Sequence, residues 1–235
     1  MFGAFSQLAR DIGTANAVFY SVSHVLRLAS SGRVRLLKYY FTAQRVPDGD
    51  VTPPRRGQEI VVSEASPAEI HATLTSRPRS VIDSRLASGC RCLIARKDGE
   101  LVGFQWLTMQ DYPEDEVRCL FHFDPEDKCA WDFDIFVLPN SRLQPVFARL
   151  WDACNRILRD AGVRHSMSRI NASNGASRRA HERIGARTVG WAMFLCIGSS
   201  QLAVFSSRPW FHASISKTSA PVLTVSRMAR KLPES

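Results

Sequence analysis

Apolar residues in the first thirty positions recur at alternating steps of three and four. The series consists of Phe5, Leu8, Ile12, Ala15, Phe19, Val22 and Leu26. This spacing predicts a helix with one apolar stripe along its length. We expect Gly13 to break the helix into two pieces, Thr14 to cap the second piece, and Ser30-Ser31-Gly32 to end it.

The rest of the chain alternates between short apolar runs and helical patterns. The apolar runs predict strands at 33–46, 59–63, 90–96, 101–109, 117–123, 131–138, 166–170, 187–196 and 201–206. Helices are expected from Ser66-Pro67, at 78–86, at 144–161 and from 174 to a stop at 185. Asp98-Gly99 predicts a tight hairpin turn. The Ser-rich tail from 207 is expected to be irregular, with Trp210 and Phe211 as the residues that would pack.

This order of elements predicts a mixed α/β (α+β) fold. Short hairpins join several of the strands, so we expect a mostly antiparallel sheet flanked by helices. The chain has 235 residues and is 45% hydrophobic, which suffices for one domain with terminal appendages. We expect an amphipathic helix and a basic strand at 1–46, a core domain at 47–207 and a basic tail at 208–235.

The net charge of +9 is concentrated at the two ends. Residues 1–46 carry six Lys or Arg and one acid, residues 208–235 carry five and one, and the middle carries twenty of each sign. Basic ends favour an anionic surface, either lipid or nucleic acid, although solubility or a protein partner explains them equally well. Nucleic-acid binding is disfavoured, because the core is neutral and no recognition motif is present.

The N-terminal stripe has two interpretations. It packs on the domain as an ordinary core element, or it lies in a membrane interface with the following basic cluster at the level of the headgroups. No segment approaches the roughly 20 apolar residues needed to span a bilayer. We expect a cytoplasmic protein, and a peripheral place on the inner face of a membrane is the alternative.

The six cysteines form no repeated metal-binding pattern. Reduced thiols are the expectation for a cytosolic protein, and Cys90 and Cys92 are expected in the core. Cys119, His122 and Cys129 lie close in sequence, but no fourth ligand is apparent. We expect no metal.

The segment from Asn174 to Ala186 carries the clearest functional pattern. Asn174 is a good N-cap and Gly185 a good helix stop. The segment resembles the late signature of the GNAT acyltransferases, with His181 where that family usually has Tyr and Ala186 where it usually has Phe. The order of elements over residues 59–207 is also similar to the GNAT fold.

The resemblance implies an acyl-CoA donor, either acetyl-CoA or a longer acyl-CoA, and an amine acceptor that attacks the thioester directly. It also implies that the diphosphate of CoA binds at the start of the long helix, where free N–H groups and the helix dipole favour an anion. The family motif Arg/Gln-x-x-Gly-x-Gly/Ala falls on 142–147, where only Arg142 matches. Pro145 has no N–H to donate, and Phe147 adds bulk.

The resemblance further implies that the strand at 131–137 splays from its neighbour and offers N–H groups to the thioester. The residues expected to contact acyl-CoA are Phe136, Val137, Arg142, Gln144, Asn174 and Ser177.

Three residues are candidates for catalysis. His181 would protonate the leaving thiolate, and Glu116, the member of an acidic run nearest to a strand, would act as the base. Asp134 is expected to share one face of a strand with Asp132 and to position the amine or act as a base through water. The alternatives are a surface histidine, a solvated turn and an ion pair with an arginine.

The function expected from these residues is acyl-CoA-dependent N-acyl transfer to an amine. The basic ends and the stripe suggest an acceptor at a membrane, such as an amino-lipid of the sphingoid-base type. The alternative is a catalytically silent GNAT-like binding module, which the degenerate loop at 142–147 favours. The oligomeric state is left open.

Overall fold

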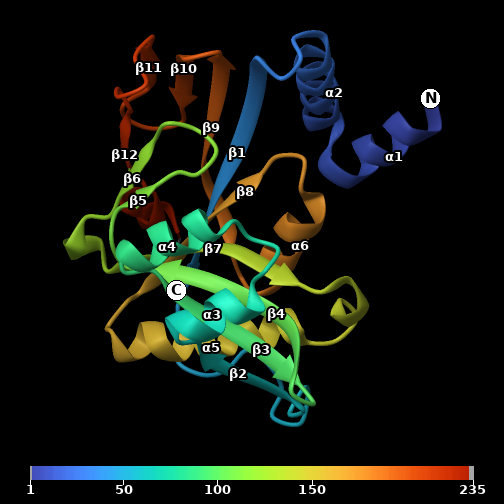
Figure 1. The fold of residues 1–235 in the computed structure, drawn as a ribbon, viewed down its shortest axis with the longest axis vertical. Helices are drawn as coiled ribbons and strands as arrows, with labels where there is room; N and C mark the ends of the chain where they lie inside the picture. The colour runs from blue at the N-terminus through green and yellow to red at the C-terminus, as the bar shows by residue number, and fades with distance from the viewer. Residues whose placement is uncertain (1, 233–235) are drawn as a thin grey trace. The chain divides into compact units, whose positions relative to one another are not determined.

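The computed structural model describes residues 2–232, and the chain divides into two compact units. One unit combines residues 1–44, 111–124 and 167–235, and the other combines 45–110 and 125–166. Figure 1 labels their helices and strands, and the two units are described in turn. The domain boundaries predicted at 46 and 207 remain predictions.

Two helices open the first unit, α1 (Phe2–Ile12) and α2 (Thr14–Ala29). The break between them falls at Gly13, as predicted, with a φ of +86° that favours glycine. The prediction that Thr14 caps α2 was wrong, because Gly13 is the N-cap and makes no side-chain cap bond. The predicted end at Ser30–Gly32 is confirmed, since the N–H of Gly32 bonds back to the carbonyl of Arg27 at 2.7 Å.

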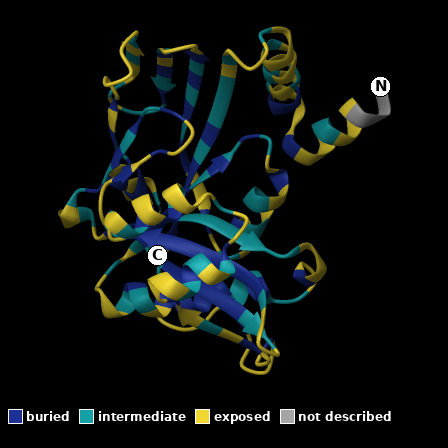
Figure 2. Cartoon of the chain, viewed as in Figure 1, coloured by how far each residue is buried: buried dark blue, intermediate teal, exposed yellow. Residues whose placement is uncertain are grey.

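The face that α2 buries differs from the expected stripe. Its inner side holds the buried Asn16 and Ala17, and the Ser23 hydroxyl donates to the carbonyl of Leu36 at 2.6 Å. Val22, a member of the expected stripe, is 46% exposed, so the structure does not pack it on the domain. It belongs to an outward-facing series in which every residue is at least 46% exposed: Val18, Val22, Val25 and Leu28. These side chains make an exposed apolar face on α2, and Figure 2 shows exposed positions along this helix in yellow.

The strand β1 (Val34–Arg45) is central to the first unit, where the strand order is β11-β10-β9-β1-β8. It pairs antiparallel with β9 over ten partners, from Val34 opposite Ile197 to Ala43 opposite Arg187. The other strands are β8 (His165–Asn171), β9 (Arg187–Ile197), β10 (Ser200–Phe205) and β11 (Phe211–Ser214). The predicted N-terminal strand is therefore an internal strand of the sheet.

The C-terminal tail contradicts its prediction. It forms β11, β12 (Val222–Thr224) and the 3-10 turn η3 (Ser226–Lys231). Strand β12 pairs parallel with β6 (Leu120–His122), the short remainder of the strand expected at 117–123, and β6 pairs with β5 (Tyr112–Pro113). Trp210 and Phe211 are about 60% exposed, and Leu223 and Val225 are fully buried instead. Leu223 and Val225, two positions apart, therefore pack the tail into the core, although the composition of the tail is mostly polar.

The second unit is a four-stranded antiparallel sheet in the order β7-β4-β3-β2. Its strands are β2 (Ile60–Glu64), β3 (Arg91–Lys97), β4 (Glu100–Thr108) and β7 (Cys129–Val137). The predicted hairpin turn is confirmed, because Asp98 and Gly99 both have positive φ, at 52° and 83°. Figure 2 shows β3 and β4 as the most deeply buried strands of this unit.

Helices cover both faces of this sheet (Figure 1). They are α3 (Pro67–Thr73), α4 (Arg79–Ala87) and α5 (Val146–Asp160), with 3-10 turns η1 (Pro125–Asp127) and η2 (Pro139–Ser141). The predicted start of α3 is confirmed, since the Ser66 hydroxyl accepts from the N–H of Glu69 at 3.3 Å. Helix α5 begins two residues later than predicted, because Pro145 takes the N-cap position. In residues 2–232, no helix combines the length and apolarity needed to cross a bilayer.

Candidate active site

The helix α6 (Gly175–Arg183) of the first unit carries the segment that the sequence singled out. Its capping is as predicted: the side-chain oxygen of Asn174 accepts from the N–H of Ser177 at 3.0 Å, and Gly185 follows the helix with a φ of +92°. These bonds account for Asn174 and the backbone of Ser177 without a ligand. Their predicted contacts with acyl-CoA remain predictions.

The imidazole of His181 is held by its own helix. Only 4% of the residue is exposed, and its Nδ1 lies 2.8 Å from the carbonyl of Ser177. A carbonyl oxygen accepts only, so Nδ1 carries a proton and donates it. The neutral ring therefore has Nε2 as its acceptor nitrogen, and the ring can donate from Nε2 only as imidazolium. The catalytic role of His181 remains a prediction.

The other catalytic candidate of the first unit, Glu116, belongs to a four-residue cluster. Its carboxylate accepts from the hydroxyl of Tyr39 and from Arg169, both at 2.8 Å. The same guanidinium contacts the carboxylate of Glu114 at 2.6 Å and lies 4.3 Å from the centre of the Tyr39 ring. The two carboxylates differ in exposure, because the Glu114 side chain is 1% exposed and that of Glu116 is 48% exposed.

Burial and charge set the proton affinities in this cluster. Burial raises the pKa of Glu114 to about 7, and the charge of Arg169 only partly offsets it. Burial also raises the pKa of Tyr39 far above its usual value. The carboxylates and Tyr39 outweigh burial at Arg169, whose pKa is raised, so this guanidinium stays charged. The cluster thus joins a permanent cation, a carboxyl that titrates near neutrality and a solvent-accessible carboxylate.

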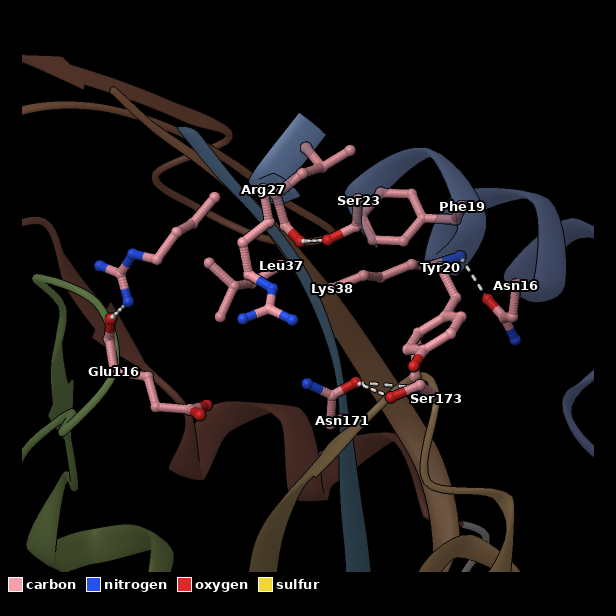
Figure 3. A pocket seen from close by; sticks show the side chains of 13 residues that line it. Asn16, Phe19, Tyr20, Ser23, Arg27, Leu37, Lys38, Glu116, Asn171 and Ser173 are labelled. Atoms are coloured by element: carbon pink, nitrogen blue, oxygen red, sulfur yellow. Dashed lines mark hydrogen bonds between the residues drawn. The ribbon is translucent and has the colours of Figure 1, made fainter. Parts of the chain in front are cut away.

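Glu116 lies at the edge of a pocket of about 250 Å³ within the first unit (Figure 3). The lining comes from α2, β1, the loop between β5 and β6, and the end of β8 with the residues that follow it. It comprises Asn16, Phe19, Tyr20, Ser23, Arg27, Arg35, Leu36, Leu37, Lys38, Glu116, Asn171, Ala172 and Ser173. Arg35 donates to the backbone carbonyl of Glu116 at 3.1 Å and so fixes the segment that carries this carboxylate. A base at the edge of a small pocket that mixes polar and apolar groups is suited to take a proton from a bound amine.

In the second unit, the prediction that Asp132 and Asp134 share a face is wrong. The pairing of β7 with β4 shifts register between Phe104 and Trp106, and Asp134 has a φ of +47°. One extra residue in a strand reverses the alternation of faces beyond it. Asp132 accepts from the Ser166 hydroxyl at 2.9 Å, whereas Asp134 turns to arginines at and before α4.

Asp134 forms the ion pair that was the alternative to a catalytic role. It accepts from both Arg77 and Arg85, the latter at 2.6 Å, and its side chain is 13% exposed. Burial alone would raise its pKa, but the hydrogen bonds from the two guanidiniums outweigh burial and hold the pKa below its usual value. A carboxylate of this kind is a weak base, so the structure favours a structural role for Asp134.

The two arginines also stack on aromatic rings of the same face. Arg85 lies 5.3 Å from the ring of Trp106 and 5.0 Å from that of Phe133. Arg77 lies 5.3 Å from Phe104 and 5.9 Å from Phe136. Phe136 was predicted to contact acyl-CoA. Because its ring already stacks with Arg77, a contact with CoA would have to come from its backbone. Val137 pairs with Gly103 at the end of β7.

The start of α5 fits an anionic diphosphate only in part. Arg142 is exposed and the first-turn amides of α5 have no partner within the helix, which favours an anion. Against this, the N–H of Gln144 already donates to the carbonyl of Ser141 at 3.0 Å, its side chain accepts from Lys97, and Pro145 has no N–H. Phe147 lies against Trp151 of its own helix, with ring centres 6.3 Å apart.

Sequence reasoning missed Tyr39, Glu114 and Arg169. Tyr39 and Arg169 are the middle residues of unremarkable strands, and nothing in their local patterns indicates that β1 and β8 meet Glu116. Glu114 belongs to the acidic run from which Glu116 was selected, but the expectation that a charge run is solvated hid its burial. In the described part of the chain, no group of three or more His, Cys, Asp or Glu is arranged to hold a metal. All six cysteines lie in the described part of the chain, where they are buried and form no disulfide.

Several solved structures match this chain at low sequence identity. A functionally unknown conserved protein from Staphylococcus epidermidis matches with a TM-score of 0.52 and 12% identity, over 74% of this chain and 66% of its own. A Drosophila protein matches with a TM-score of 0.49 and 15% identity, over 74% and 56%. A putative GNAT acetyltransferase from Novosphingobium aromaticivorans matches with 0.44 and 16%, over 68% and 63%. The chain thus spans about two thirds or less of each of these proteins.

No curated protein matches the sequence. The model of the acetyltransferase (GNAT) family matches residues 59–186, which is more than half of the 235 residues. The match covers the strands β2 to β8 and ends after α6, so it contains both the α5 start and the His181 segment. The chain therefore belongs to the acetyltransferase (GNAT) family, with the acetyltransferase domain of an enzyme over residues 59–186.

Proposed function

We propose that this protein transfers an acyl group from acyl-CoA to a primary amine, with Glu116 as the base. The observation that carries the proposal is the position of Glu116, a half-exposed carboxylate at the edge of a 250 Å³ pocket and oriented by Tyr39 and Arg169. Family membership supplies the reaction class, since GNAT acetyltransferases use a CoA thioester as donor.

In the proposed reaction, Glu116 takes a proton from the ammonium or from the attacking nitrogen, directly or through one water. The amine nitrogen then bonds to the thioester carbonyl carbon, and the C–S bond breaks. His181 as imidazolium would return a proton to the departing thiolate. On the donor side, Arg142 and the amides of the first turn of α5 would bind the phosphates of CoA.

The finer proposal concerns the acceptor and the acyl length. The exposed apolar face of α2 and the basic N-terminal segment favour an acceptor presented at an anionic membrane, such as an amino-lipid, of which a sphingoid base is one candidate. Long-chain acyl-CoA is the corresponding donor. Flotation of the protein with anionic vesicles tests the membrane part, and deletion of residues 1–32 should abolish recovery with the vesicles.

The test of the reaction is release of free CoA from acetyl-CoA and palmitoyl-CoA in the presence of a panel of amines, with mass spectrometry of the products. We expect one amide product whose mass is the sum of the parent carboxylic acid and the amine less one water. CoA release that does not depend on the amine, with no amide formed, would contradict the proposal.

A catalytically silent binding module is the second candidate. The observation in its favour is the start of α5, where Pro145 and the engaged N–H of Gln144 remove two donors that an anion would use. Calorimetry with acetyl-CoA and palmitoyl-CoA separates the two candidates. No heat of binding from either acyl-CoA would support the silent module.

A further inference from the structure

The pocket beside Glu116 is basic. Three cationic side chains contribute to its lining, Arg27 from α2 and Arg35 and Lys38 from β1, against the single carboxylate of Glu116 among its lining residues. No acidic residue occurs in the sequence between Asp11 and Asp48, so the two elements that form this wall carry no compensating charge of their own. A cavity lined in this way attracts an anion.

Lys38 is held in a fixed position. Its ammonium donates to the side-chain oxygen of Asn16 at 3.0 Å and lies 5.2 Å from the ring of Tyr40 and 5.9 Å from that of Phe19. The hydroxyl of Tyr40 donates to the same oxygen at 3.0 Å, and the amide of Asn16 donates to the carbonyl of Ile12 at 2.9 Å. Asn16 is 7% exposed, so this is a built feature of the wall.

Arg27 is different, because it forms no ion pair with any residue in the described range 2–232. Figure 3 shows it entering the pocket from α2 on the side opposite Asn171 and Ser173. Arg35 uses one nitrogen on the backbone carbonyl of Glu116. Two guanidiniums with remaining donors match the oxygens of a phosphate group.

The volume limits the ligand. At about 250 Å³ the pocket is smaller than the roughly 300–1,000 Å³ typical of sites for drug-sized ligands, so a whole acyl-CoA does not fit. Hydroxyl and amide groups from Ser23, Asn171 and Ser173 line it beside the rings of Phe19 and Tyr20. These features suit a compact polar group with a few carbon atoms.

We propose that this pocket binds the phosphate of an acceptor that carries both an amine and a phosphate, with Arg27, Arg35 and Lys38 on the phosphate and Glu116 facing the amine. The inference rests on the proposed function and narrows its acceptors to amino-phosphates, free or as a phospholipid headgroup. It also gives a role to the N-terminal segment, because α2 and β1 lie outside the residues 59–186 that define the family.

The first experiment measures binding without any acyl-CoA. Calorimetry at low salt compares phosphoethanolamine, ethanolamine and inorganic phosphate. We expect saturable binding of phosphoethanolamine, weaker binding of inorganic phosphate and none of ethanolamine. Equal binding of ethanolamine and phosphoethanolamine, or no binding of either phosphate compound, would overturn the inference.

The variant Arg27→Gln tests the site itself. Because Arg27 is exposed in the last turn of α2, its loss should leave the fold intact, which circular dichroism verifies. We expect binding of phosphoethanolamine to weaken by about tenfold or more, as for the loss of a charged hydrogen bond. The matched control is Arg33→Gln, an exposed arginine outside the pocket with the same change in charge. Equal weakening in both variants would mean nonspecific attraction and would overturn the site.

Two further experiments address two questions: whether the phosphate belongs to a lipid headgroup or to a free amino-phosphate, and whether the site acts in acyl transfer. Flotation with phosphatidylethanolamine in phosphatidylcholine vesicles, against phosphatidylcholine alone, identifies a lipid headgroup, and binding of soluble phosphoethanolamine without selective flotation identifies a free amino-phosphate. In the CoA-release assay, equal kcat/KM for ethanolamine and phosphoethanolamine would overturn the inference while acyl transfer stands. Binding that depends on Arg27, without CoA release from any acyl-CoA, would overturn the proposed function while the phosphate site stands.

Discussion

The guanidinium of Arg169 lies 2.6 Å from the carboxylate of Glu114, a side chain that is 1% exposed. Its second nitrogen binds Glu116 at 2.8 Å, so one partly buried cation links a buried carboxyl to an accessible one. Because the two carboxylates share this cation, a change in the charge of Glu114 alters the electrostatic environment of Glu116. The cluster therefore has consequences for both stability and activity.

The first prediction concerns the pH dependence of stability. Burial raises the pKa of Glu114 to about 7 from 4.5, so between these values the unfolded chain has lost a proton that the folded protein keeps. The free energy of unfolding should therefore fall as the pH rises from 4.5 to 7, by at most about 1.4 kcal/mol per pH unit. The total is roughly 3 kcal/mol for this group.

Glu114→Gln removes this dependence. Denaturant unfolding of the wild type and the variant at pH 5, 6, 7 and 8 measures the difference, which should change up to pH 7 and level off above it. Asp115→Asn, a neighbouring change of the same charge, should keep the slope of the wild type. A slope that survives in Glu114→Gln would show that another group carries it.

The second prediction concerns Glu116. Glu116→Gln keeps the shape of the side chain but removes the base, so kcat should fall by about 10²- to 10⁴-fold. The KM for acyl-CoA should stay within about twofold, because the base does not act on the donor. Asp115→Asn again serves as the control and should retain activity. Full activity in Glu116→Gln would assign the base to another residue.

The elements of this fold could largely be predicted from the sequence, because periodicity, caps and turn residues are local signals. The hairpin at Asp98-Gly99 and the helix between Asn174 and Gly185 are examples in which a single residue type fixes the backbone. The prediction of an irregular tail after residue 207 was wrong because Ser and Lys conceal a short alternation around Leu223 and Val225. In such segments, pairing with a neighbouring strand determines the structure more than local propensity does.

The candidate site was less predictable, since its contacts join residues far apart in the sequence. Tyr39 and Glu116 are separated by 77 positions, and the pocket needs α2, β1 and the end of β8 together. Asp134 shows a different limit. Alternation predicts its face correctly only in a regular strand, and the bulge in β7 is not marked by a glycine or proline.

The third prediction tests whether Asp134 acts in structure or in catalysis. Asp134→Asn leaves Arg77 and Arg85 without their common anion, so the protein should lose about 3 kcal/mol of stability. At a temperature where the variant stays folded, kcat should be within a few-fold of the wild type. Thermal unfolding measures the loss of stability, and steady-state kinetics on a separate portion of the same preparation measures kcat.

Asp83→Asn is the matched control in the same unit, because its carboxylate is 61% exposed and, among residues 2–232, forms an ion pair only with His71. It should cost less than about 1 kcal/mol. Because the guanidiniums lower the pKa of Asp134, the stability that it supplies is present above the unfolded value of 3.8 and is lost as the pH falls through the folded value. A loss of kcat without a loss of stability would restore the catalytic interpretation.

The fourth prediction separates capping from ligand binding at Asn174. Asn174→Ala removes the bond to the N–H of Ser177 and should cost about 1 kcal/mol of stability. Asn174→Ser retains a capping oxygen and should restore most of this stability. The two variants should then rank alike in stability and in the KM for acyl-CoA if capping is the whole role. Restored stability with a KM that stays raised would indicate a contact with the donor.

The last prediction concerns the donor site at the start of α5. If acyl-CoA binds there despite Pro145, its phosphates would contact Arg142, whose exposed side chain comes directly after η2. Arg142→Gln should then raise the KM for acyl-CoA by about tenfold with little change in kcat. The effect should shrink as salt is added, because screening already weakens the contact in the wild type. Arg79→Gln, an exposed arginine at the start of α4, makes the same change in charge in the same unit and should leave the KM unaltered. If Arg142→Gln and Arg79→Gln behave alike, the phosphates are bound elsewhere. The loss of the family glycines before α5 would then reflect a donor site that has moved.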